Sequence, residues 1–212
     1  MITLELARTL YPADADSAHD FDHVWRVVKL ADYIALREGA EVDIVHVAAL
    51  LHDLGLEAGR AGHETSAARR ATDLLREHGY AEPFVAAVVH AIESHRFRSG
   101  PPPRTLEARV LFDADKLDAI GAMGVARAFA FGGRRGQKLW ADVPPDYADP
   151  LDGREADPRQ HTPVHEYHVK LKKIRERLYT ATGRALAEER QAYMAGFYAQ
   201  LDREVKGEGE PR

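Results

Sequence analysis

The chain has 212 residues, of which 45% are hydrophobic, which is enough for one substantial core, and we expect a single domain over residues 1–212. Its 34 acidic and 29 basic residues are intermixed and give a formal net charge of -5, which disfavours a polymeric DNA or RNA partner. The absence of cysteine excludes disulfides, so a metal site would have to use histidine and carboxylate.

The distribution of apolar residues bears on location. No apolar stretch approaches the ~20 residues that a membrane helix needs, and the first residues contain no apolar run of the kind found in a signal peptide. We therefore expect a soluble, cytoplasmic protein without membrane association.

The N-terminal part of the chain contains two helix patterns. Apolar residues recur at three- and four-residue steps from Phe21 to Leu36, which predicts an amphipathic helix with His23 in its first turns. Residues 42–54 are mostly apolar and predict a buried helix. His52 and Asp53 then lie at the end of a core helix, where imidazole and carboxylate need partners.

The middle of the chain predicts three further helices. Residues 64–78 and 84–94 have amphipathic patterns, and Thr105 is a suitable N-cap for a helix that follows three prolines. This last helix carries Asp115 and Asp118, which are three residues apart and therefore face the same way.

Residues 132–161 are rich in Pro, Asp, Gly and Arg and lack helical or strand periodicity. We interpret them as a flap near the site, because irregular segments of this length are usually functional or mobile. Helices from 163 to about 179 and from 183 or 184 to 205 complete the chain. The prediction is an all-α, compact multi-helix bundle of roughly seven to nine helices, with an irregular flap between residues about 132 and 162.

Four metal-seeking residues fall in three of the helix patterns: His23, the doublet His52-Asp53, and Asp115. Imidazole and carboxylate together suit a hydrolytic divalent cation, whereas unpaired charges on apolar helices would be costly. The order of the segments His-Asp-Phe-Asp-His23-Val, Leu-Leu-His52-Asp53-Leu-Gly and Asp-Ala-Asp115-Lys-Leu-Asp resembles the HD-domain superfamily of metal-dependent phosphohydrolases. The last segment is similar to the bacterial branch that acts on small nucleotides.

The resemblance implies that His23, His52, Asp53 and Asp115 bind a divalent metal ion, and that Asp53 would bridge two ions if a second is present. We expect manganese (Mn²⁺), while magnesium, iron, nickel, cobalt or zinc would also suit this ligand set. Asp53 is also a candidate catalytic residue.

Lys116 and Asp118 are the other candidate catalytic residues. The lysine would neutralise a substrate phosphate, and Asp118 would hold a ligand imidazole or a metal-bound water. The alternative is an ordinary surface ion pair. Arg26 shares the face of His23 and is a candidate phosphate-binding residue.

His63 and His95 match two additional histidines that many family members have. They would bind phosphate or a second metal ion, and both roles stay open because a neutral imidazole ligates metal while an imidazolium donates to phosphate. The alternative is that they are helix-end histidines without a role in the site. A separate histidine group, His161, His165 and His168, lies in a polar segment, and we interpret it as a solvated helix face.

The expected function is hydrolysis of a small nucleotide, in particular a (deoxy)nucleoside triphosphate, by attack of a metal-activated water on phosphorus. One alternative is a phosphodiesterase for cyclic nucleotides or short oligonucleotides, and another is a sensor that binds metal and nucleotide without turnover. We expect a monomer or homodimer whose partner is a small nucleotide. The base, the sugar, the scissile bond, the number of metal ions and the general acid stay open.

Overall fold

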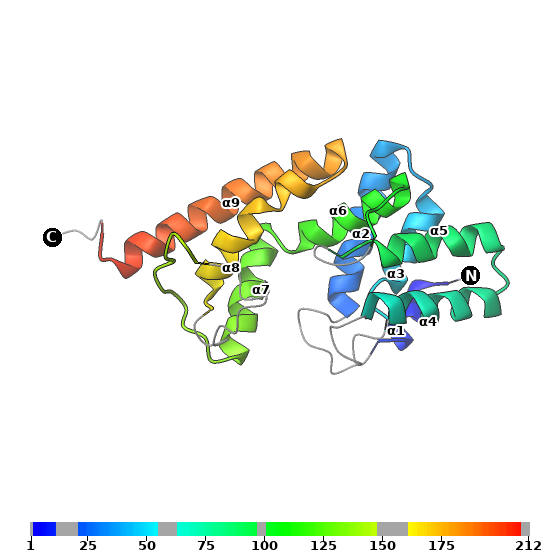
Figure 1. The fold of residues 1–212 in the computed structure, drawn as a ribbon, viewed down its shortest axis with the longest axis horizontal. Helices are drawn as coiled ribbons and strands as arrows, with labels where there is room; N and C mark the ends of the chain where they lie inside the picture. Colours follow the sequence, from blue (N-terminus) through cyan, green and yellow to red (C-terminus); the bar gives the residue numbers. More distant parts are fainter. Residues whose placement is uncertain (1, 12–20, 55–62, 97–100, 148–160, 209–212) are drawn as a thin grey trace. The chain divides into compact units, whose positions relative to one another are not determined.

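The computed structural model describes residues 2–11, 21–54, 63–96, 101–147 and 161–208. Every regular element in these ranges is a helix, as Figure 1 shows, which confirms the predicted all-α fold. The α-helices are α1 (Leu4–Thr9), α2 (Phe21–Glu38), α3 (Val42–Leu51), α4 (His63–Glu77), α5 (Glu82–Glu93), α6 (Leu106–Asp118), α7 (Gly121–Arg134), α8 (Pro163–Val169) and α9 (Ala181–Val205). None of these helices combines the length and the apolarity required to cross a membrane.

The chain divides into two compact units. Unit 1 comprises Met1–Asp118 together with Leu178–Gly183, and unit 2 comprises Ala119–Arg177 together with Arg184–Arg212. The single domain expected over the whole chain remains a prediction.

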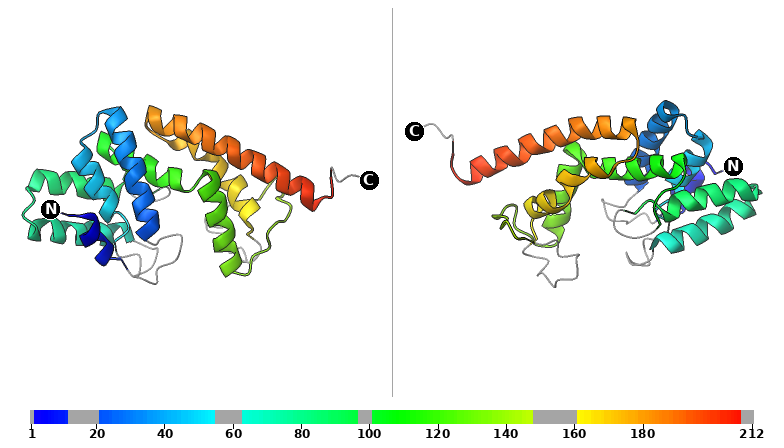
Figure 2. Two further views of the ribbon diagram at one scale, coloured as in Figure 1. Left: turned by 180° about the vertical axis from the view of Figure 1, so that it is seen from behind. Right: turned by 45° about the horizontal axis from the view of Figure 1, so that its top comes forward.

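In unit 1, the helices α2, α3 and α6 all pack against one another, and α5 packs against α3, α4 and α6. The two views in Figure 2 show the same neighbours, with the blue α2 beside the green α6. Ile34, Leu50 and Leu111 are fully buried where these helices meet. Because burying such a side chain contributes about 1.5–3 kcal/mol, this apolar core can fix the helices that carry the polar residues described below.

The turn that joins α2 to α3, and the end of α3, position His52 and Asp53. Gly39 has a left-handed backbone with φ 75°, and its N–H donates to the carbonyl of Ala35 at 2.9 Å, which ends α2 without strain on a side chain. The helix α3 ends at Leu51, three residues before the predicted end. His52 is its C-terminal cap and Asp53 lies in the following turn. The doublet therefore lies just beyond a buried helix.

The helix α6 is attached to a distant part of the chain by the buried carboxylate of Asp113. Its Oδ1 accepts a hydrogen bond from the N–H of Tyr179 at 2.9 Å, and its Oδ2 accepts from the N–H and the hydroxyl of Thr180, both at 2.7 Å. The Thr180 hydroxyl in turn accepts from the N–H of Gly183 at 2.9 Å, in the first turn of α9. A Cβ at Gly183 would lie 2.5 Å from Asp113 Oδ2, so this arrangement requires glycine.

Unit 2 is organised around aromatic side chains on α7, α8 and α9. The rings of Tyr167 and Tyr198 stack with centroids 4.2 Å apart, and Phe129 contacts Phe197 at 5.7 Å. Residues 135–147 contain no helix, as predicted, although α7 continues to Arg134 and so extends three residues into the segment expected to be irregular. The rest of the expected flap, residues 148–160, lies outside the described residues, and its place near the site stays a prediction.

The helix predicted from 163 to about 179 is wrong in its second half. The helix α8 ends at Val169 and is followed by two short 3-10 turns, Leu171–Lys173 and Arg175–Arg177. Just beyond this end, the carbonyl of Leu171 accepts from the N–H of Ile174 at 3.2 Å and from the side-chain amide of Gln191, on α9, at 2.9 Å, so it is satisfied without a continuing α-helix. The contact with Gln191 joins residues 20 positions apart, so local periodicity could not indicate it.

Candidate metal centre

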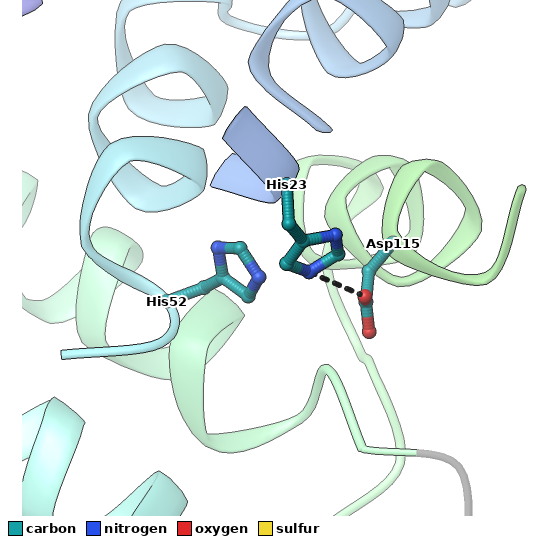
Figure 3. Close-up of side chains that lie close together, drawn as sticks. All are labelled: His23, His52 and Asp115. Atoms are coloured by element: carbon teal, nitrogen blue, oxygen red, sulfur yellow. Dashed lines mark ion pairs between the residues drawn. The ribbon is translucent and has the colours of Figure 1, made fainter. Parts of the chain in front are cut away.

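Three helices of unit 1 bring their metal-seeking residues together. His23 lies in the first turn of α2, His52 follows α3, and Asp115 lies near the end of α6. Figure 3 shows the three side chains pointing toward one another, and one ligand atom from each lies within 4.8 Å of the other two. The Nε2 atom of His23 is 3.5 Å from Oδ1 of Asp115. The spacing is that of atoms which can share one cation after small adjustments.

Asp53 completes the group predicted from the sequence. Its Oδ2 lies 3.6 Å from Nε2 of both His23 and His52. Its Oδ1 lies 3.8 Å from Nε2 of His95, a buried histidine at the end of α5. The structure therefore brings the four predicted metal ligands together and adds His95 near the other oxygen of Asp53, with its ring centroid 5.3 Å from that of His52.

All three imidazoles have the same orientation toward this centre. The Nδ1–H of His52 donates to the carbonyl of Ala49 at 2.8 Å, and that of His95 donates to the carbonyl of Ile92 at 2.5 Å. In the same way, Nδ1 of His23 lies 2.7 Å from Oδ2 of Asp118. Since carbonyl and carboxylate oxygens only accept, the proton of each neutral ring is on Nδ1 and the lone pair is on Nε2. Each lone pair is thus available to a metal ion.

The Nε2 atom of His52 provides a test of whether a metal ion fits. This atom is buried and has no hydrogen-bond partner among the described residues. Leaving a buried polar atom without a partner costs about 1–3 kcal/mol, and a cation would remove that cost. Two imidazole nitrogens and two carboxylates are also a ligand set that suits divalent ions such as manganese, iron or zinc. The residues present therefore fit a divalent metal ion.

The charges around the centre favour these protonation states. Burial alone would raise the pKa of Asp115, but the ammonium of Lys116 holds it well below its ordinary value. Burial lowers the pKa of His95 to about 4. Near neutral pH, Asp115 is therefore an anion and His95 is a neutral imidazole, and both can donate electron pairs to a metal ion.

Two cations lie beside the centre, and each is paired with a carboxylate of α6. Nζ of Lys116 pairs with Oδ2 of Asp115, and Nε of Arg26 donates to Oδ1 of Asp118 at 2.7 Å. Asp118 is buried and also contacts His23, which matches the imidazole-holding role among the two that the sequence left open. The phosphate-binding roles of Arg26 and Lys116 stay predictions, as does any catalytic role of Asp118.

For His63, one of the predicted site residues, the structure describes only the backbone. His63 is the first residue of α4, and its side chain lies outside the described part of the structure. Its expected role as a phosphate or second-metal residue stays a prediction. Sequence reasoning also missed Asp113, whose partners Tyr179 and Thr180 are more than sixty residues away.

The second histidine group, in unit 2, was only partly interpreted correctly. His165 is buried and its ring lies 4.3 Å from that of Tyr147, so a solvated face is wrong for this residue. Its Nδ1 contacts the hydroxyl of Thr162, the N-cap of α8, at 2.8 Å. The capping pair Thr162 and His165 was the signal that the sequence analysis overlooked. No metal-binding group that includes these histidines is found in the described ranges.

Comparisons with known proteins agree with this fold. The family model described as HD domain matches residues 20–120. YpgQ of Bacillus subtilis, described as uncharacterized, is 35% identical over 198 residues that cover 92% of this chain and 88% of YpgQ. The crystal structure of Bacillus subtilis YpgQ in complex with ADP aligns with a TM-score of 0.75 and 32% identity, over 97% of this chain and 99% of that one. An HD-superfamily hydrolase from Bacillus thuringiensis aligns with a TM-score of 0.71 and 29% identity, over 96% of each chain.

The helical fold and the converging His, His-Asp and Asp residues are typical of hydrolases that hold a divalent metal ion between helices. The matched family model and the similarity over nearly the whole of YpgQ identify the group more closely. The chain belongs to the HD-domain superfamily of metal-dependent phosphohydrolases.

Proposed function

We propose that this protein hydrolyses a small nucleotide, with (deoxy)nucleoside triphosphates as the expected substrates, and that His23, His52, Asp53 and Asp115 hold the required divalent ion. The observation that carries the proposal is the convergence of Nε2 atoms on Asp53, with Nε2 of His52 buried and lacking a hydrogen-bond partner among the described residues. Such an ion, when bound, would activate a water molecule and neutralise charge on the phosphoryl oxygens.

The protein's own residues would prepare the site for this chemistry. Asp118 holds His23 with its Nε2 toward the centre, and the carbonyl of Ala49 does the same for His52. Lys116 places a positive charge beside Asp115, where it can face a phosphate oxygen. The buried surroundings limit access of bulk water, which strengthens each of these charge interactions.

The preference for a nucleotide is supported by similarity. YpgQ, with 32% identity over nearly the whole chain, was crystallised in complex with ADP. The charge of the centre adds a physical argument. Three carboxylates, Asp53, Asp115 and Asp118, outnumber the two cations Arg26 and Lys116. An anionic nucleotide would therefore be repelled until a divalent ion is bound, and we expect binding and turnover to require metal.

The ligand types favour manganese over magnesium. Magnesium favours oxygen ligands and retains several waters, whereas the proposed set contains at least two imidazoles. Manganese accepts both kinds of ligand, and iron, cobalt, nickel and zinc do so as well. His95, whose Nε2 lies 3.8 Å from Oδ1 of Asp53, would be a ligand of a second ion if two are bound.

The test is an activity matrix with product identification. The full chain, freed of metal with a chelator, would be supplied in turn with manganese, magnesium, iron, cobalt, nickel or zinc and assayed on nucleoside triphosphates, deoxynucleotides, cyclic nucleotides and short oligonucleotides. We expect manganese-dependent release of phosphate or pyrophosphate from triphosphates. Turnover confined to diesters would instead support the phosphodiesterase, and saturable binding without product would support the sensor.

A matched pair of variants on one segment controls this test. Asp53→Asn keeps the shape of the side chain but removes its charge, and we expect turnover to fall by about 1,000-fold or more. Asp43→Asn changes an exposed carboxylate in the first turn of α3 and should leave turnover unchanged. Equal activity of both variants would contradict the assignment of the metal site.

A further inference from the structure

The two cations beside the metal centre differ in what their partner carboxylates do. Asp118, the partner of Arg26, contacts Nδ1 of His23, on the side of the ring that faces away from the centre. Asp115, the partner of Lys116, has its Oδ1 3.5 Å from Nε2 of His23, on the side that faces the centre. Lys116 is thus paired directly with a proposed metal ligand, whereas Arg26 is paired with Asp118, which only contacts one.

The ammonium of Lys116 lies inside the site rather than at the surface. Lys116 is only 9% exposed, and its Nζ lies 5.1 Å from the centroid of the Phe112 ring. An ammonium has three N–H donors, and here one is directed to Oδ2 of Asp115. The ammonium is therefore held beside a carboxylate that we propose as a metal ligand.

We propose that Lys116 is a positioning and phosphate-binding residue with opposite effects on the two ligands of the site: it weakens the binding of the metal ion and strengthens the binding of the phosphate. In the metal-free protein, Lys116 neutralises Asp115. Once a divalent ion takes up the charge of Asp115, the ammonium becomes the partner of a substrate phosphate. This inference rests on the proposed function and assigns an order to it, with metal bound before nucleotide.

The opposite signs follow from the charges of the centre. With neutral imidazoles, Asp53, Asp115 and Asp118 together with Arg26 and Lys116 carry a net charge of -1. Without Lys116 the charge would be -2, which attracts a divalent cation more strongly and, after that cation has bound, attracts an anionic phosphate less. The same substitution should therefore tighten one interaction and loosen the other.

The opposite expectation for the metal would follow if Lys116 acted as an orienting partner. Groups that hold a ligand in place usually strengthen metal binding, and Asp118 has that relation to His23. Lys116 differs because it is a cation on a flexible stem, next to Asp115 on the same helix, and the backbone of α6 already fixes the position of Asp115. Its charge should consequently outweigh its orienting effect.

The experiment uses the chelator-stripped full chain and two titrations followed by calorimetry: Mn²⁺ into the protein, and ADP into the Mn²⁺-loaded protein. For Lys116→Met we expect Mn²⁺ to bind about 10-fold more tightly and ADP about 10-fold more weakly. Lys116→Arg keeps the charge, and both affinities should stay within about 3-fold of the wild type.

Two further variants serve as controls for the opposite changes in Mn²⁺ and ADP affinity. One tests whether any change of a charged residue on α6 gives them, and the other tests whether any loss of a lysine does. Asp118→Asn should weaken Mn²⁺ binding by about 10- to 100-fold, opposite in sign to Lys116→Met although both residues lie on α6. Lys29→Met removes an exposed lysine of α2 that packs on Trp25 and should change neither affinity.

The proposal is overturned if Lys116→Met leaves Mn²⁺ affinity unchanged or lowers it, or if it does not weaken ADP binding. Where the methionine variant does not fold, Lys116→Gln answers the same question, and the gain in unfolding temperature on adding Mn²⁺ should exceed that of the wild type. Opposite shifts without nucleotide turnover by the wild type would uphold the role of Lys116 and refute the proposed hydrolysis. Turnover with shifts of the same sign would refute only the role of Lys116.

Discussion

Each unit of this protein contains a cluster of histidine and carboxylate, and the two clusters differ in where the ring nitrogens point. In unit 1, the Nδ1 atoms of His23 and His52 are bound to protein oxygens, and both Nε2 atoms lie 3.6 Å from one oxygen of Asp53. In unit 2, His161 uses both nitrogens within the protein: Nδ1 lies 3.0 Å from the hydroxyl of Tyr147, and Nε2 lies 3.0 Å from Glu166.

This difference explains why a count of histidines is a poor guide to a metal site. The unit 2 cluster satisfies itself, since Glu166 also pairs with Lys170 at 2.8 Å, and a cation would have to break bonds that already exist. The unit 1 cluster leaves Nε2 of His52 buried without a hydrogen-bond partner among the described residues. Imidazoles whose Nδ1 atoms are bonded to the protein and whose Nε2 lone pairs converge indicate a metal site. Histidines whose two ring nitrogens are both hydrogen-bonded within the protein indicate a structural role.

The largest expected effect tests this comparison directly. Replacing His52 with alanine removes one of the convergent nitrogens, and we expect Mn²⁺ affinity to fall by about 100-fold or more and nucleotide turnover to fall with it. Replacing His161 with alanine removes a nitrogen pair that only contacts protein, and Mn²⁺ affinity should not change. Calorimetric titration of both variants provides the measurement. Equal losses in the two variants would show that the comparison between the clusters is mistaken.

The fold was predictable from the sequence wherever a helix has an apolar face of its own. Residues 64–78 were predicted for the helix that spans His63–Glu77, and Thr105 caps α6 by accepting from the N–H of Ala108 at 3.2 Å. The 3-10 turns after α8 were not predictable, because the carbonyl of Leu171 in the first of them is bonded to Gln191, which lies 20 residues further along the chain. Periodicity reports on local burial, not on a side chain that arrives from another helix.

The sequence was sufficient to predict which residues form the candidate site, but not which of their side chains contact one another. The order of the His, His-Asp and Asp segments, and the resemblance that it carries, named the four residues that the structure brings together. Helix periodicity alone does not distinguish the three carboxylates of α6: Asp113 accepts backbone N–H groups, Asp115 faces the imidazoles, and Asp118 holds His23. Their partners come from segments far away in the chain, and only the packed helices decide which carboxylate meets which partner.

The next prediction concerns Asp113, which lies on α6 in unit 1. Like the unit 2 cluster, its carboxylate is already hydrogen-bonded to other groups of the protein. Asp113→Ala would leave the N–H groups of Tyr179 and Thr180 without their buried acceptor, and we expect unfolding free energy to fall by about 3 kcal/mol. Chemical denaturation would measure the loss. Gly183→Ala should also be destabilising, because its Cβ would lie 2.5 Å from Asp113 Oδ2. A variant as stable as the wild type would contradict this role.

A smaller effect is expected in unit 2, on the acidic side of the pH range. Burial alone would raise the pKa of Glu166, but the bond to His161 and the ammonium of Lys170 lower it from 4.5 to about 2. A carboxyl with a lowered folded-state pKa stabilises the protein above its unfolded pKa, and this contribution is lost as pH falls from about 4.5 toward about 2. We expect the stability advantage of wild type over Glu166→Gln to shrink by about 1–2 kcal/mol across that range.

Denaturation of both proteins at pH 5.5 and pH 3 would measure this difference, and the variant serves to cancel the titration of other carboxyl groups. Lys206 and Asp202 form an exposed pair of the same i, i+4 spacing as Lys170 and Glu166. Asp202→Asn is therefore a matched control that should show a much smaller dependence, because an exposed pair is screened by water. A pH-independent difference between wild type and Glu166→Gln would show that Glu166 has no such role.

The smallest expected effect concerns His46, which lies on α3 and therefore shares a helix with the segment that leads to His52. Its Nδ1 lies 3.0 Å from Oδ2 of Asp32, much as Nδ1 of His23 contacts Asp118, but both side chains of the His46 pair are about a third exposed. The bond to Asp32 raises the pKa of His46, although partial burial opposes it. A raised pKa means that the pair stabilises the fold fully below the unfolded value of 6.5, and this contribution is lost as pH rises through the folded value.

Because water screens this exposed pair, we expect wild type to exceed His46→Gln in unfolding free energy by only about 0.5 kcal/mol more at pH 5.5 than at pH 8.5. Asp32→Asn should abolish the same pH dependence, and denaturation curves of the three proteins at both pH values would test it. A dependence of opposite sign would mean that burial, rather than Asp32, controls His46. His46 would then resemble His95 of the metal centre, whose pKa is lowered by burial. In that case, a raised pKa beside a carboxylate would no longer separate a surface histidine such as His46 from a buried histidine of the metal centre.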